Sequence, residues 1–229
     1  MPNRRDSVHD YYRSVPGGGL LLEKAAASSL FAYHGPALEY STVTRSDLNG
    51  YSNWARDRSP ADRALMLDAF FSAVVPAIER AGGVFFRDEG DCIVALFSDY
   101  FARGASYHKV RLYCQEVTRQ RYGSAQLAAK TCVACGNVAI FQKRHEVASG
   151  DWSAEGEPFV RAARLEAAID SKQHFVFYED DYRKHFAAVT TWAAPGTKAP
   201  WNYYNENVQV AGLGAVGGWT TVDRFEYEG

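Results

Sequence analysis

The sequence has little net charge, few prolines and no long apolar run, and each shortage excludes a class of protein. Its 229 residues include 25 lysines and arginines against 27 aspartates and glutamates, a formal net charge of −2. Such a balance provides no basic field to hold duplex nucleic acid or an anionic membrane. The longest strongly apolar stretch, residues 69–78, is far shorter than the about 20 residues of a membrane span. With 47% hydrophobic residues and 8 prolines, we expect one large domain and no disordered or fibrous chain.

Signals for export and for a zinc site are also missing. Residues 3–6 are polar and charged, and more polar residues follow them in place of an apolar signal core, so we expect a cytoplasmic protein. Cys132 and Cys135 have the spacing of half a zinc site, but no second pair follows. Their segment reads as a strand, where residues three apart face opposite sides. We therefore expect ordinary reduced thiols.

The chain begins with a segment of unknown role and continues as one domain. Residues 1–37 contain no motif that we can interpret, and we expect a leader there, followed by a folded domain at residues 38–229. Alternation and β-branched residues predict a first strand at 38–44. The clearest helix signal is the sequence Ser-Pro-Ala-Asp at 59–62, a capping box with proline at the first helical position. Apolar residues recur at helical spacing from there to Gly82, where we expect the helix to stop.

The rest of the chain alternates short strands and helices, with hairpins among them. Two apolar runs at 84–87 and 92–97 flank an acidic turn with a glycine, which predicts a hairpin. We further expect a helix at 100–122, a strand pair at 126–141, a helix at 157–170, a strand at 174–178, a helix at 180–186, a loop at 201–204 and a hairpin of 208–210 with 220–222. Hairpins among alternating elements favour an α/β (α+β) fold with a mixed central sheet over a doubly wound parallel sheet.

Two aspartates are candidate metal ligands because each follows or precedes a predicted strand close to a glycine. Asp47 lies three residues before Gly50, and Asp91 directly follows Gly90. If their strands are neighbours, the two carboxylates meet, and two carboxylates with substrate phosphates are a usual way to hold Mg²⁺ or Mn²⁺. Leu48 can add a backbone carbonyl, and the amides after Gly50, ahead of an expected helical turn, can cradle phosphate oxygens. The alternative is that each aspartate only forms a turn.

The order and spacing of these motifs resemble those of the class III nucleotidyl cyclases, over about residues 38–222. The matching motifs are Asp47-x-x-Gly50-Tyr51, the capped helix ending at Gly82-Gly83, Arg87-x-x-Gly90-Asp91 with an apolar strand to Phe97, Gly136-Asn137-Val138, and Gly156-x-x-Phe159-Val160-Arg161-Ala162-Ala163-Arg164-Leu165. Within that family, a short chain without a sensor domain and the tyrosine at position 51 are most similar to the pyrimidine cyclases of the Pycsar antiphage system, which make cyclic UMP or cyclic CMP.

The resemblance implies a fold, a metal centre and a site shared between two subunits. The fold would be a ferredoxin-like mixed central sheet flanked by helices, in a head-to-tail homodimer. Asp47, Asp91 and the carbonyl of Leu48 would hold two Mn²⁺ or Mg²⁺ ions. Arg164 of the other subunit would stabilise charge on the α-phosphate, since charge developing on a phosphoryl group needs a preplaced cation. The residues expected to contact the substrate are Asn49, Gly50, Tyr51, Arg87, Ser153 and Arg161.

Two departures from the family pattern concern the phosphates and the ribose. The family's asparagine, four residues before the arginine, is Val160 here. No lysine lies between residues 208 and 222, where adenylyl cyclases carry a second phosphate-binding cation. Arg161 is a candidate to replace it. Both losses favour a catalytically silent nucleotide-binding regulator, whereas the retained aspartates and Arg164 favour an enzyme.

Two further departures concern the base. Adenylyl cyclases read adenine with a lysine and an aspartate, at the positions of Arg87 and Ser153. Two uracil carbonyls suit the donor fork of a guanidinium, whereas cytosine would place an amino donor against it. Tyr51, with its hydroxyl, can fill space that a purine would need. Arg87 has the alternative role of a surface strand residue paired with Asp88 or Glu89.

We therefore expect an enzyme that converts UTP to 3′,5′-cyclic UMP and diphosphate, which would act on a separate effector in antiphage defence, as the resemblance implies. The alternatives within the same class are a cytidylate, adenylyl or guanylyl cyclase. The alternatives from other classes are the silent nucleotide-binding regulator and a polymerase-like palm, against which the helix at residues 162–165 argues.

Overall fold

The computed structural model describes residues 37–98, 106–142, 152–181, 201–212 and 218–228 of the chain. All strands of these segments belong to one mixed sheet, with the order β2-β3-β1-β4-β6-β8-β7 and with β5 paired to β4. Only β4 and β6 run parallel, and the other neighbours are antiparallel. The strand bounds are β1 Ala37–Leu48, β2 Val84–Glu89, β3 Cys92–Ser98, β4 Ala129–Gln142, β5 Trp152–Glu155, β6 His174–Tyr178, β7 Trp201–Gln209 and β8 Trp219–Tyr227.

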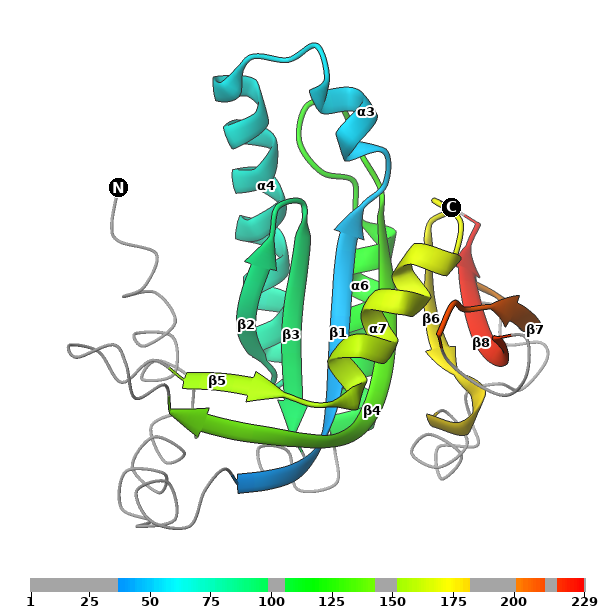
Figure 1. The fold of residues 1–229 in the computed structure, drawn as a ribbon. Coiled ribbons are helices and arrows are strands. Elements are labelled where there is room, and N and C mark those ends of the chain that lie inside the picture. Colours follow the sequence, from blue (N-terminus) through cyan, green and yellow to red (C-terminus); the bar gives the residue numbers. More distant parts are fainter. Residues whose placement is uncertain (1–36, 99–105, 143–151, 182–200, 213–217, 229) are drawn as a thin grey trace.

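Helices cover the two faces of the sheet unequally (Figure 1). One face carries α4 (Pro60–Arg80) and α6 (Ser106–Arg119), and the other carries α7 (Glu157–Ala168). The short α3 (Tyr51–Ala55) follows β1 directly. This is the mixed α+β architecture with flanking helices that the alternation of elements predicts. Among the described helices, none is both long and apolar enough to pass through a bilayer.

Strict alternation along β3 divides the interior into two hydrophobic cores. Ile93, Ala95 and Phe97 pack in the core under α4 and α6, whereas Val94 and Leu96 pack in the core under α7. Since successive side chains of a strand point to opposite faces, this strand is buried on both sides. It therefore lies inside the sheet, next to β1, where it can position the end of that strand.

The first long helix begins as its sequence predicts. Ser59 is the N-cap, its Oγ accepts a hydrogen bond from the backbone N–H of Asp62 over 3.1 Å, and it donates to the Asp62 carboxylate over 2.7 Å. The helix continues through Pro76 to Arg80, and Gly82 follows with a φ of 76°. The hairpin of β2 and β3, the helical turn α3, strand β6 and the pairing of residues 208 and 220 are likewise confirmed.

Three expected elements differ in the structure. The strand pair expected at 126–141 is one strand, β4, because Gly136 and Asn137 continue the ladder with β1 opposite Ser41 and Tyr40. The expected loop at 201–204 is the start of β7, which pairs with β8 along its whole length. The helix expected at 100–122 is described from Ser106 and ends at Arg119. The helix expected at 180–186 lies largely outside the described residues.

Candidate functional site

The two aspartates expected to bind metal lie at neighbouring strand ends. β1 and β3 run antiparallel with Asp47 opposite Cys92, so Asp91 in the β2–β3 turn lies beside the end of β1. The backbone N–H of Leu48 donates to the carbonyl of Asp91 over 3.2 Å, which fixes this approach. Asp91 also contributes electrostatically to the raised pKa of Asp47. The structure therefore brings together the pair that the sequence predicts, with Leu48 between them and its side chain buried in the core.

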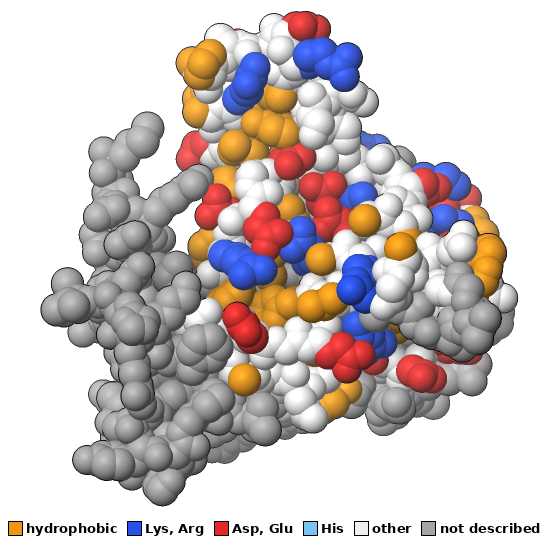
Figure 2. Space-filling view, viewed as in Figure 1, with side chains coloured by type: hydrophobic (Ala, Val, Ile, Leu, Met, Phe, Trp, Pro, Cys, Tyr) orange, Lys and Arg blue, Asp and Glu red, His pale blue; other side chains and the backbone are white. Residues whose placement is uncertain are grey.

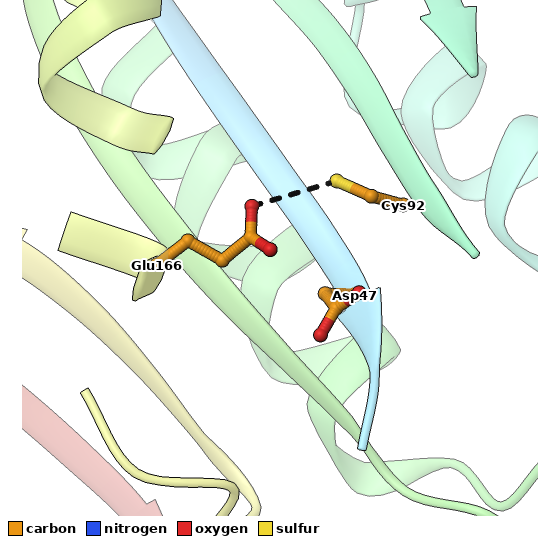
Figure 3. A group of neighbouring side chains, drawn as sticks. All are labelled: Asp47, Cys92 and Glu166. Carbon is orange, nitrogen blue, oxygen red and sulfur yellow. Dashed lines mark hydrogen bonds between the residues drawn. The ribbon is translucent and has the colours of Figure 1, made fainter. Parts of the chain in front are cut away.

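A third carboxylate, that of Glu166 on α7, was not expected at this place. One ligand atom each of Asp47, Cys92 and Glu166 lies within 4.8 Å of the others (Figure 3). The sequence does carry a signal for it, since Glu166 follows Ala162 by four residues and Phe159 by seven. It thus falls on the stripe of α7 that buries Phe159, Ala162 and Leu165 against the sheet. A charged residue on a buried stripe indicates a partner or a site.

Burial, and after it the charges of Glu166 and Asp91, raise the pKa of Asp47 to about 7. Burial and Glu166 also raise the pKa of Asp91. Lys130 of β4 opposes this effect, with its Nζ 3.8 Å from Asp47 Oδ2. Arg45 opposes it as well, but the two cations do not outweigh burial and the neighbouring carboxylates, so ionising Asp47 remains costly without a further cation.

The donor atoms fit a hard divalent cation. Carboxylate oxygens are the ligands that Mg²⁺ and Mn²⁺ prefer, and a cation would remove the repulsion between Asp47, Asp91 and Glu166. Burial raises the pKa of the Cys92 thiol well above its usual value, so this sulfur stays protonated and is a poor ligand. The carboxylates of Asp47 and Asp91, with the peptide of Leu48 between them, are therefore the groups best suited to metal, because the Glu166 carboxylate already accepts a hydrogen bond from Arg45 Nε.

The segment after Asp47 turns sharply and is held on both sides. The backbone N–H of Asn49 donates to the carbonyl of Ala128 over 2.9 Å, and its Nδ2 donates to the carbonyl of Lys172 over the same distance. Gly50 has a φ of 75°, a conformation that favours glycine. Tyr51 lies half-buried near Asp91, and burial followed by the charge of Asp91 raises the pKa of its hydroxyl. These residues thus border the aspartate pair.

Arg87 and Ser153, the residues expected to read the base, lie on strands β2 and β5. The Nε of Arg87 pairs with Glu89 Oε1 at 2.7 Å, which is the ion pair that we weighed as its alternative role. Its guanidinium lies 5.3 Å from the ring centroid of Phe86 and 5.8 Å from that of Phe159. Ser153 is half-buried opposite Phe141 in the β4–β5 ladder. Within the described part of the chain, no contact joins Arg87 to Ser153.

The two arginines of α7 have different surroundings. Arg161 is engaged inside its own chain, where Nη1 donates to the carbonyl of Cys135 and to Asp181 Oδ1, both over 3.1 Å, and the guanidinium lies 4.2 Å from the Tyr178 ring centroid. Arg164 is exposed and donates to the carbonyl of Gly212 in the β7–β8 connection. The largest charge effects on the pKa of Asp47 come from Glu166, Asp91, Lys130 and Arg45, and those on Asp91 from Glu166 and Lys130.

Comparison with known proteins supports the fold. No family model matches the sequence, and no curated protein matches it. Among solved structures, the adenylyl cyclase CyaB from P. aeruginosa aligns with a TM-score of 0.60 at 12% identity, over 82% of this chain and 94% of that one. The guanylate cyclase domain of RhGC from Catenaria anguillulae, in complex with GTP, aligns with a TM-score of 0.62 at 14% identity, over 83% and 98%. The guanylyl cyclase Cya2 gives 0.56 at 20% identity, over 83% and 93%. The chain thus has the fold of the class III cyclase catalytic domains.

Proposed function

We propose that this protein is a nucleotidyl cyclase that forms a 3′,5′-cyclic nucleotide from a nucleoside triphosphate with Mn²⁺ or Mg²⁺. The observation that carries the proposal is the meeting of Asp47 and Asp91 at neighbouring strand ends, where burial and nearby carboxylates raise the pKa of Asp47, in a class III cyclase fold. A divalent cation is the natural counterpart of such clustered carboxylates. Two bound ions would activate the ribose 3′-hydroxyl and neutralise the triphosphate.

The proposed reaction exchanges one phosphorus–oxygen bond for another. The 3′-oxygen bonds to the α-phosphorus, the bond from the α-phosphorus to the oxygen shared with the β-phosphate breaks, diphosphate leaves, and the hydroxyl proton passes to water. Asp47 and Asp91 would hold the metal, whose charge would stabilise the phosphates at the reacting end of the substrate. The turn at Asn49 and Gly50 and the half-buried Tyr51 border the phosphates and sugar. Charge developing on the phosphoryl oxygens still needs a preplaced cation.

Arg164 supplies that cation from a second copy of the chain. Its side chain is exposed, and the largest charge effects on its own Asp47 come from other residues, which agrees with a role in another subunit. The active enzyme is then a head-to-tail homodimer with two composite sites. Arg161 is a weaker candidate for a phosphate contact than its sequence position indicates, because Asp181 and the carbonyl of Cys135 already occupy its guanidinium.

UTP is the proposed substrate and cyclic UMP the product. Arg87 presents a guanidinium fixed through its Nε and laid against two aromatic rings, while half of its side chain stays exposed. Its Nη donors suit carbonyl acceptors of uracil better than the amino group of cytosine. The product would then act on a separate effector in antiphage defence, in a cytoplasmic setting.

A catalytically silent nucleotide-binding regulator is the second candidate, and Val160 favours it. This side chain is 47% exposed on α7, four residues before Arg164, at the position where the cyclases carry asparagine. A valine there offers no hydrogen bond to ribose or phosphate. Such a protein would bind a triphosphate tightly and leave it unchanged.

One experiment separates these candidates. The purified protein is incubated in turn with ATP, GTP, CTP and UTP in the presence of Mn²⁺, and the products are identified by mass spectrometry. We expect cyclic UMP from UTP, and no cyclic product from the Asp91→Asn variant under the same conditions. Cyclic product from another triphosphate would correct the base assignment. Binding without product from all four would support the silent regulator and refute the cyclase.

A further inference from the structure

A continuous chain of ion pairs connects the elements that carry the candidate site residues. Arg87 Nε lies 2.7 Å from Glu89 Oε1, and the other oxygen of Glu89 accepts from Arg45 Nη1 over 2.7 Å. Arg45 Nε then donates to Glu166 Oε2 over 2.5 Å. The chain runs from β2 through β1 to α7, on the face of the sheet where basic and acidic side chains lie interspersed (Figure 2). Of its four residues, only Arg87 has been assigned a contact with metal or substrate above.

The other three residues of this series of ion pairs each lie two positions along the sequence from a candidate site residue. Arg45 precedes Asp47 by two on β1, and Glu89 precedes Asp91 by two at the end of β2. Glu166 follows Arg164 by two on α7. Because side chains two apart on a strand share a face, Arg45 lies on the same side of β1 as Asp47. The ion pairs therefore join the three segments that carry Asp47, Asp91 and Arg164.

Arg45 is the centre of the arrangement and is well buried. Its side chain is 10% exposed, against 17% for Glu166 and 36% for Glu89. A planar guanidinium presents its donors in a fixed fork, so it sets the direction of both carboxylates, which a lysine cannot do. Glu89 is held from both sides, because one carboxylate oxygen pairs with Arg45 Nη1 and the other with Arg87 Nε, each at 2.7 Å.

A second contact ties α7 to the same place. Lys130 Nζ donates to the backbone carbonyl of Glu166 over 3.1 Å while it faces Asp47. Buried ionic networks contribute little net stability compared with apolar packing, and fixing one arrangement is their better supported role. Here the arrangement they fix is the placement of β2 and α7 relative to the end of β1.

We infer that Arg45 is a positioning residue for the cyclase reaction, acting through Glu89 on the base-reading Arg87 and through Glu166 on the helix that carries Arg164. This inference rests on the proposed function. The two ion pairs of Arg45 act on different steps, and we call them the Glu89 arm and the Glu166 arm. The Glu89 arm orients Arg87, which contacts the base in the ground state. The Glu166 arm orients α7, whose Arg164 stabilises charge that develops in the transition state.

The two arms are tested separately with isosteric variants that keep the side-chain shape. We expect Glu89→Gln to raise KM for UTP about tenfold and to lower the preference for UTP over CTP about fivefold, with kcat nearly unchanged. We expect Glu166→Gln to lower kcat about thirtyfold with KM nearly unchanged. Arg45→Lys keeps the charge but loses the fork, so it should show both effects. Glu116→Gln, which removes the ion pair of Glu116 with Arg80 on the far helices, is the matched control.

Three results would overturn the inference, and they are distinguishable. If the three variants all lower kcat and raise KM to the same extent, in proportion to a lowered melting temperature, the network is merely structural. A higher Mn²⁺ requirement in Glu166→Gln, without a change in kcat at saturating metal, would make Glu166 a metal ligand. If the wild-type protein forms no cyclic product from any triphosphate, the proposed function itself fails and the positioning role falls with it.

Discussion

Replacing Asp47 by asparagine should stabilise the metal-free protein while abolishing its activity. The folded-state pKa of Asp47 is about 7, raised from 3.8 by burial and by the charges of Glu166 and Asp91. A pKa raised in the folded state means that the folded protein binds more protons than the unfolded chain between these two values. The stability that this group contributes is fully present below pH 3.8 and is lost as the pH rises through 7.

The magnitude follows from the same numbers. At pH 8 the difference between a pKa of about 7 and one of 3.8 corresponds to about 4 kcal/mol of lost stability. The carboxylate is still 18% exposed, and asparagine also gives up the attraction of Lys130, 3.8 Å away. We therefore expect a gain of about 2 kcal/mol in the free energy of unfolding for Asp47→Asn.

Urea unfolding at pH 8 in the presence of a chelator measures this gain. The matched control is Asp68→Asn, an exposed position on α4, which should change the free energy of unfolding by no more than about 0.5 kcal/mol. Adding Mn²⁺ should stabilise the wild type and leave Asp47→Asn nearly unaffected, because the cation relieves the same repulsion. A variant less stable than the wild type without metal, or stabilised equally by Mn²⁺, would refute the assignment of a charged metal site.

Two further predictions concern residues outside the aspartate pair. Burial lowers the pKa of His174, whose side chain is 0% exposed, to about 4, although Asp170 lies 3.4 Å away and opposes the shift. Below pH 6.5 the unfolded chain therefore binds more protons than the folded protein, so stability falls as the pH drops from 6.5 towards 4. Urea unfolding at pH 7.5 and pH 5 should show that His174→Gln removes about 2 kcal/mol of this loss. An unchanged pH dependence would contradict the buried neutral histidine. A Cβ on Gly156 would lie 2.4 Å from the carbonyl oxygen of Asn137, so Gly156→Ala should displace the start of α7, costing about 1 to 3 kcal/mol and lowering turnover as well. Wild-type melting temperature and turnover in this variant would show that the helix has room to shift.

Local signals account for the elements that the sequence predicts well. The cap at Ser59 and the apolar spacing behind it are properties of one segment, and both appear in α4. The aspartate pair could also be predicted, since a hairpin and one preceding strand need only pair as neighbours to bring Asp47 and Asp91 together. Short-range patterns were therefore enough to predict the centre of the sheet and the candidate metal ligands.

The features that the sequence did not predict depend on packing between segments that are far apart in the chain. Gly136 reads as a break between two strands, but it continues β4, where a Cβ would lie 3.0 Å from Pro158 Cγ at the start of α7. β7 is a half-exposed edge strand, and its polar composition hides the alternation expected of a strand. The stripe of α7 indicates that Glu166 is buried, but its contact with Arg45 depends on how α7 lies across the sheet, and a local pattern does not contain that information.

The most direct test of the account mixes two inactive variants, because the proposed site takes its metal ligands from one chain and its arginine from another. Asp47→Asn and Arg164→Ala are each expected to be inactive when assayed alone. When the two proteins are mixed and allowed to exchange subunits, half of the dimers carry one intact site, and about a quarter of the wild-type cyclic UMP production should return. No recovery in a mixture shown to contain the mixed dimer, or full activity of Arg164→Ala alone, would contradict a site built from two chains.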